Sequence, residues 1–137
     1  MHRRAFQPLA LAAAALGLLA VPVPASAAFR QFIMPSRNIA CGGDTRFLRC
    51  DILHHTWHAP KKPRSCEFDW GGAIGMTRRG RVKFQCVSDS MFNNHVLKYG
   101  RTWHNGRFTC RSRTTGLRCT NAAGHGFRVS RQKLVRF

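Results

Sequence analysis

Six cysteines limit the folds open to this chain, and all of them lie between positions 41 and 119. They stand at positions 41, 50, 66, 86, 110 and 119. An even number of cysteines in a short exported chain is typical of a disulfide framework. Because no CxxC pair occurs, neither a zinc ribbon nor a thioredoxin-like redox site is supported. We therefore expect disulfides, no metal and no cofactor.

The first 27 residues have the pattern of a secretory signal peptide. A basic start precedes an apolar run of 13 residues from Leu9 to Val21, and Ala25-Ser26-Ala27 supplies a typical cleavage site. Spanning a bilayer takes about 20 residues. We therefore expect cleavage before Ala28, a location outside the cell or in its envelope, and a single domain over residues 28–137. A retained signal anchor is the alternative.

Two cysteine pairs stand in similar contexts, which predicts two similar hairpins. In each, an apolar residue lies two positions before the first cysteine, eight residues separate the cysteines, and Leu-Arg precedes the second. The two stretches are Ile39–Cys50 and Phe108–Cys119. Cross-strand neighbours and disulfides share a typical Cα separation of about 5.5 Å. We predict the bridges Cys41–Cys50 and Cys110–Cys119, which leaves Cys66–Cys86; crossed pairing is the alternative.

Short alternating runs between glycine turns predict strands, and no window of a dozen residues has uninterrupted helical spacing. The predicted strands are Phe29–Met34, Arg46–Leu53, Arg81–Val87, Gly106–Arg111, Leu117–Thr120 and Gly126–Ser130. Asn105-Gly106 favours a type I′ turn. At most one short helix fits, around Asp89–Leu97. We predict an all-β, mainly antiparallel fold, a small disulfide-bridged barrel or sandwich with hairpin repeats.

Short motifs follow one another along nearly all of residues 29–137. In order they are Pro35-Ser36-x-Asn38-Ile39-x-Cys41, Arg49-Cys50-Asp51-Ile52, Cys66-x-x-Asp69-Trp70-Gly71, Cys86-x-Ser88-Asp89, Leu97-x-Tyr99-Gly100, Cys110-x-Ser112, Gly116-Leu117-x-Cys119-Thr120 and Gly124-His125-Gly126-Phe127-x-x-Ser130-Arg131. This succession resembles a family of small secreted actinobacterial proteins that share a cysteine-rich domain of unknown function. The resemblance implies secretion and this fold class, and it implies no catalytic residues. Arg37 departs from the family pattern, in which glycine is usual.

The charge of the predicted mature chain points to anionic partners. Residues 28–137 hold 21 Lys and Arg against 5 acids, a formal charge of +16, and 16 of the 21 are arginines. Such a field attracts polyanions, and the guanidinium group suits bidentate contacts with phosphate or carboxylate. Basic residues beside aromatic rings are typical of grooves that bind single-stranded nucleic acid. The candidate binding residues are Arg101, Trp103, Arg107 and Arg128. The alternative is a basic surface without a dedicated ligand, with the rings in the core.

Histidines supply the weak candidates for catalysis. His125, between two glycines, could act with His95 or His104 as acid and base on a phosphodiester. In the alternative interpretation, His125 bonds a backbone carbonyl and stabilises its turn.

A second group, His54, His55 and His58, would suit a metal only on a helix, and the neighbouring prolines favour a loop. We therefore expect a non-enzymatic module that binds an anionic polymer or surface. A small secreted hydrolase that acts on a phosphodiester or cell-wall polymer through His125 is the alternative.

Overall fold

The computed structural model describes Gly17, residues 20–22 and residues 28–137. Most of the predicted signal peptide therefore lies outside the described residues. The described part forms ten strands in two five-stranded antiparallel sheets, as the predicted all-β class requires. No helix that could cross a membrane is found among these residues.

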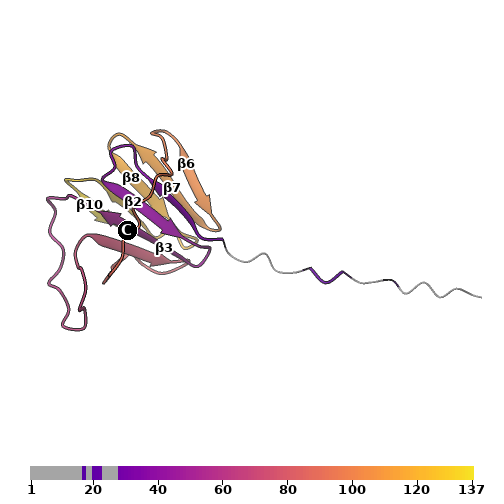
Figure 1. The fold of residues 1–137 in the computed structure, drawn as a ribbon, viewed down its shortest axis with the longest axis horizontal. Helices are drawn as coiled ribbons and strands as arrows, with labels where there is room; N and C mark the ends of the chain where they lie inside the picture. Colours follow the sequence, from indigo (N-terminus) through magenta and orange to yellow (C-terminus); the bar gives the residue numbers. More distant parts are fainter. Residues whose placement is uncertain (1–16, 18–19, 23–27) are drawn as a thin grey trace, which may run out of the picture.

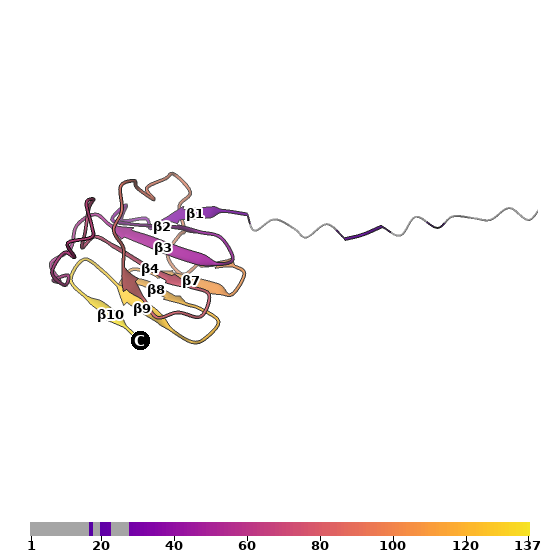
Figure 2. The same cartoon turned by 90° about the horizontal axis from the view of Figure 1, so that it is seen from below.

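Each sheet is a meander in which every strand pairs with the next one in the sequence (Figure 1). The N-terminal sheet contains β1 (Arg30–Ile33), β2 (Ile39–Gly43), β3 (Phe47–Ile52), β4 (Ala73–Thr77) and β5 (Lys83–Phe84). The C-terminal sheet contains β6 (Thr102–Asn105), β7 (Phe108–Arg113), β8 (Gly116–Thr120), β9 (Gly126–Val129) and β10 (Leu134–Arg136). Figure 2 shows the two sheets as layers, β1–β4 over β7–β10.

The two sheets repeat each other strand for strand in register. In both, two cysteines face each other across the second and third strands, and hydrophobic residues of the first and fourth strands lie directly beside them. One row is Phe32, Cys41, Cys50, Ile74 and Phe84. The other row is Trp103, Cys110, Cys119, Phe127 and Arg136. The sequence similarity of the two cysteine hairpins therefore extends to the strands on both sides of them.

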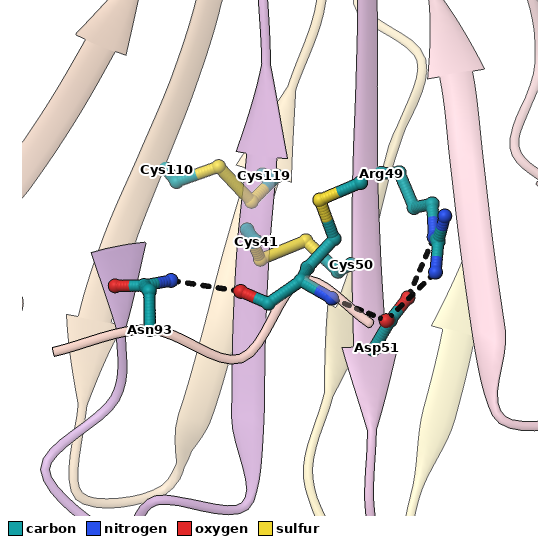
Figure 3. Close-up of a disulfide and its surroundings, with 8 residues drawn as sticks. Cys41, Arg49, Cys50, Asp51, Asn93, Cys110 and Cys119 are labelled. Atoms are coloured by element: carbon teal, nitrogen blue, oxygen red, sulfur yellow. Dashed lines mark hydrogen bonds and ion pairs between the residues drawn. A yellow bond between two sulfur atoms is a disulfide. The ribbon is translucent and has the colours of Figure 1, made fainter. Parts of the chain in front are cut away.

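The three predicted disulfides are confirmed. Cys41–Cys50 and Cys110–Cys119 each join directly opposite residues, with Cα atoms 4.1 Å apart (Figure 3). Cys66–Cys86, with Cα atoms 5.7 Å apart, ties the long excursion between β3 and β4 to the segment after β5. No cysteine of the described chain is free. Three disulfides are typical of a protein that folds in an oxidising environment.

The sheets are packed face to face around one core, so the structure is a sandwich and not a closed barrel. Phe32 and Trp103, at equivalent positions of the two sheets, contact each other with ring centroids 5.2 Å apart. Next to them, Arg30 Nη1 donates to the carbonyl of His104 (3.0 Å) and joins β1 to β6. At the opposite side, Arg136 lies over the ring of Phe84 and joins β10 to β5. Both pairs of edge strands are thus linked.

The one short helix that the sequence allowed around Asp89–Leu97 does not form; this segment has no regular secondary structure, and its Val96 forms a parallel bridge with Ile33. The predicted position of one turn was wrong. Asn105 is the last residue of β6, so the β6–β7 turn is centred on Gly106-Arg107 and not on Asn105-Gly106. Of the two central residues only Gly106 has a positive φ (58°). The buried amide of Asn105 donates to the carbonyls of Ala28 and Gly43, which holds this residue in the strand.

Arg37 lies in the turn between β1 and β2 and has a φ of 55°, in the left-handed region that favours glycine. Its side chain is exposed, so no packing contact is lost on truncation. Arg37→Gly should raise the free energy of unfolding by about 0.5–1 kcal/mol, the steric cost of this conformation minus the greater chain entropy of glycine. Urea unfolding measures the change, and Arg79→Gly, at an exposed residue without a positive φ, is the control that should not gain.

Removing a cross-strand disulfide should cost stability without changing the fold. Cys110→Ala/Cys119→Ala removes a short covalent loop, for which the chain-entropy model gives a loss of about 2–3 kcal/mol. Urea unfolding should show this loss, and far-ultraviolet circular dichroism should stay that of a β protein. A change below about 0.5 kcal/mol would show that the hydrogen bonds between β7 and β8 suffice without the bridge.

Candidate anion-binding site

A row of arginines crosses the outer face of the C-terminal sheet. Arg111 of β7, Arg118 of β8 and Arg128 of β9 stand directly opposite one another, with Thr102 and Val135 at the ends of the row. All three arginines are exposed, while the residues on either side of them along each strand are wholly or partly buried. Strand alternation therefore presents the three guanidinium groups on one surface.

These side chains line an open hollow of about 800 Å³. Arg113 and Lys133 add two more positive charges to its wall, and Thr109, Thr115 and Ser130 add hydroxyl groups. We call Arg111, Arg113, Arg118, Arg128 and Lys133 the arginine face. Val135 and Phe137 stand beside it and are 40% and 37% exposed, and Arg118 lies over the Phe137 ring at 5.0 Å from its centroid.

No aspartate or glutamate of the described chain forms an ion pair with the arginine face. All five acids of the protein lie between Asp44 and Asp89, whereas residues 90–137 contain ten Lys and Arg and no acid. The ion pairs among the described residues all involve Arg46 or Arg49, in or next to β3. Like charges directly opposite each other on neighbouring strands destabilise a sheet. The arginine row therefore costs stability in the isolated protein.

In the equivalent row of the N-terminal sheet, the one arginine is paired with carboxylates. That row is Gln31, Gly42, Arg49, Gly75 and Lys83, so Arg49 corresponds to Arg118. Arg49 is only 8% exposed and pairs side-on with Asp51, Nε to Oδ1 at 2.8 Å and Nη2 to Oδ2 at 2.9 Å (Figure 3). It also donates to the Asp89 carboxylate (2.7 Å) and to the Asp89 carbonyl (2.6 Å).

The contacts of Arg49 shift its pKa and that of Asp89. Burial opposes the positive charge of Arg49, yet the hydrogen bonds to Asp51 and Asp89 outweigh it and raise the pKa of Arg49. The same hydrogen bond lowers the pKa of Asp89. The shifts in pKa therefore favour the charged forms of both Arg49 and Asp89 in the folded protein.

Asp89 belongs to a segment that covers this face. After β5 the chain must return to the opposite edge of the sandwich, and residues 85–97 do so across the outer side of the N-terminal sheet (Figure 2). Gln85 lies over Gly75 and Met91 over Gly42, and Val96 pairs with Ile33 of β1. A Cβ atom at Gly42 would lie 2.7 Å from Phe29 Cζ and 2.8 Å from the Met91 sulfur, so a side chain there would displace both residues. We call residues 85–97 the crossing segment.

The two outer faces thus differ although the two sheets match. In the N-terminal sheet β2 is buried on both faces, because the crossing segment covers the outer one. In the C-terminal sheet β7 alternates between inward and exposed residues. No segment of the described chain crosses the row Arg111–Arg118–Arg128, and arginines replace the two glycines that allow the close crossing on the other side.

The structure separates the four predicted binding residues. Arg128 lies in the arginine row, whereas Arg101 precedes β6 and Arg107 occupies the β6–β7 turn. Trp103 is 6% exposed and points into the core against Phe32, so its ring is a packing residue. The sequence reasoning did not name Arg111, Arg113, Arg118 or Lys133. The signal for the first two was their alternation with inward-facing Cys110 and Ser112.

The three histidines considered for catalysis do not converge. His104 of β6 is three strand spacings, about 14 Å, from the start of β9 beside His125. His95 lies in the crossing segment, where its carbonyl accepts from Ile33. The backbone of His125 bonds both the side chain and the backbone of Asn121, so Asn121 organises the Gly-His-Gly turn.

No group of three metal-ligating side chains occurs in the part of the chain that the structure describes. In the loop after β3, His55 stacks on Trp57 with centroids 3.7 Å apart. The ring nitrogen of Trp57 donates to the Ser130 carbonyl (3.0 Å). This loop therefore packs against the β9–β10 turn.

Fold and surface together define a disulfide-bridged β-sandwich with one arginine-rich outer face. The chain belongs to a family of unknown function, DUF6636, whose model matches residues 13–137. Neither a curated protein nor a solved structure matches it.

Arg49 and Arg118 occupy equivalent positions, so the same substitution should have different effects at the two. Arg49→Gln leaves the Asp51 carboxylate buried without its partner and should cost about 3 kcal/mol. Arg118→Gln removes a like charge between two arginines and should leave stability unchanged or raise it by up to about 1 kcal/mol.

Urea unfolding at low and high salt measures both effects. The gain of Arg118→Gln should shrink with added salt, because exposed charges are screened. An equal loss in both variants would mean that Arg118 has a stabilising partner within the chain.

Proposed function

We propose that this protein is a secreted, non-enzymatic binding module that associates with anionic polymers in the cell envelope or outside the cell. Secretion is supported by the signal-peptide pattern of residues 1–27 and by the three disulfides. The binding surface is the arginine face. An anionic partner would supply the negative charge that the chain itself does not place there.

One observation carries this proposal: equivalent arginines of the two sheets differ in that one is paired with carboxylates and the other is not. Arg49 is held by two carboxylates, while Arg118, its equivalent, stands between two further arginines. A surface selected only for solubility needs scattered charges of both signs. Cross-strand arginines without acids are destabilising, and an anionic ligand would remove this cost.

The arginine face should account for most of the affinity for polyanions. We expect binding of the mature protein to heparin or linear polyphosphate to weaken steeply with salt, because each neutralised anion releases a counterion. Arg111→Thr/Arg118→Thr/Arg128→Thr should reduce the slope of log affinity against log salt by about 2–3. Isothermal titration calorimetry over a range of salt concentrations measures the slope.

The matched control removes the same charge elsewhere. Arg78→Thr/Arg79→Thr/Arg81→Thr changes three exposed arginines of the β4–β5 hairpin, none of which lines the hollow. This variant should keep most of the slope and affinity. An equal loss in both triple variants would reduce the interaction to net charge, and no binding at low salt would refute the proposed function.

A further inference from the structure

The contacts of Arg49 show what kind of group fits an arginine at this place in the fold. Its guanidinium is saturated by the Asp51 carboxylate, the Asp89 carboxylate and the Asp89 carbonyl. Two of these three acceptors belong to Asp89, which lies at a bend in the segment that runs across the strands. Met91 of the same segment also donates its N–H to Asp51 Oδ2 (2.9 Å). The segment that covers the N-terminal face is thus a polypeptide that offers Arg49 one carboxylate and one carbonyl, both from Asp89.

The outer face of the C-terminal sheet has the equivalent row of residues, but no segment of the described chain crosses it. Thr120 of β8 is equivalent in register to Asp51 of β3. Each lies two residues after the arginine of its strand, Arg118 or Arg49. The carboxylate built into β3 is therefore absent from β8, and the crossing segment has no counterpart in the described chain. Both sources of negative charge that serve Arg49 would have to come from a partner.

We propose that the arginine face binds an extended acidic polypeptide segment that crosses β7, β8 and β9 as the crossing segment crosses β2, β3 and β4. This inference rests on the proposed function and specifies its ligand. Arginines replace Gly42 and Gly75 in this row, so the partner carries several carboxylates where the crossing segment places Met91 and Gln85.

The dimensions of the row define the length of the ligand. Neighbouring strands lie about 4.8 Å apart, so Arg111 and Arg128 are separated by about 10 Å across the sheet. An extended chain rises about 3.3 Å per residue, so three or four residues span the row. A run of about six residues with acids at alternate positions would reach all three guanidinium groups and the apolar surface of Val135 and Phe137.

The hydroxyl groups around the row favour a peptide over a polyphosphate. Thr109 and Thr120 flank the arginines on the outer face, and Thr102 ends the row. Hydroxyls both donate and accept, which suits the alternating N–H and C=O groups of a polypeptide. A polyphosphate chain offers acceptors only, and it has no apolar side chains for Val135 and Phe137.

The first test compares two polyanions on the mature, oxidised protein. The probes are a fluorescently labelled peptide of about ten residues in which Glu alternates with Ser or Val, and linear polyphosphate of equal charge, at one fixed salt concentration. We expect the peptide to bind at least about tenfold more tightly than polyphosphate. The same peptide with Gln for Glu should not bind, and Arg111→Thr/Arg118→Thr/Arg128→Thr should abolish binding of the acidic peptide.

The second test supplies the missing carboxylate within the chain. Thr120→Asp places an acid beside Arg118 as Asp51 stands beside Arg49, and should weaken peptide binding at least about tenfold. Ser36→Asp, at an exposed residue of the β1–β2 turn, makes the same charge change away from the arginine face and should have a much smaller effect. Equal effects of the two substitutions would overturn the proposed crossing of the row.

The outcomes separate the inference from the proposed function. If polyphosphate binds the arginine face as tightly as the acidic peptide or more tightly, the peptide ligand is wrong and the polyanion-binding function stands. If neither probe binds through the arginine face, both fail.

Discussion

The packing of two matched β-meanders on one core holds this structure together, and a cross-strand disulfide lies at the centre of each inner face. Cys41–Cys50 and Cys110–Cys119 join the second and third strands of their sheets and are fully buried. A domain of this size buries a limited apolar core, so covalent bridges add a needed share of stability. Phe32 and Trp103 occupy equivalent positions of the two sheets, and the packing of the sheets brings their rings into contact.

Chain connectivity breaks this near-symmetry. Because β5 and β6 lie at opposite sides of the sandwich, the chain between them must cross one outer face, and it crosses the N-terminal sheet. Burying Arg49 beneath that crossing requires carboxylates, since an unpaired buried charge is very costly. The other face is crossed by no described segment, so Arg118 and its neighbours stay in water with their charge unneutralised. The functional proposal follows from this difference between equivalent positions.

Much of the fold was predictable from local patterns. The spacing of the cysteines and the repeated Leu-Arg-Cys context predicted both hairpins and all three bridges, and alternation predicted strands at β1, β3, β5, β7, β8 and β9. β4 was missed because both of its faces are buried, so its residues lack the alternation of a half-exposed strand. β6 and β10 were not among the predicted strands either. The one short helix allowed around Asp89–Leu97 does not form, because Asp89 and Met91 contact the sheet below.

The sequence by itself determined the disulfide pairing, the all-β class and the excess of arginine, because each depends on spacing along the chain or on composition. Only the tertiary structure decided which arginines act together. Arg111, Arg118 and Arg128 are separated by seven and ten residues and become neighbours through strand register. It also decided that Arg49 is neutralised and Arg118 is not, because the path of the crossing segment is a property of the folded sandwich.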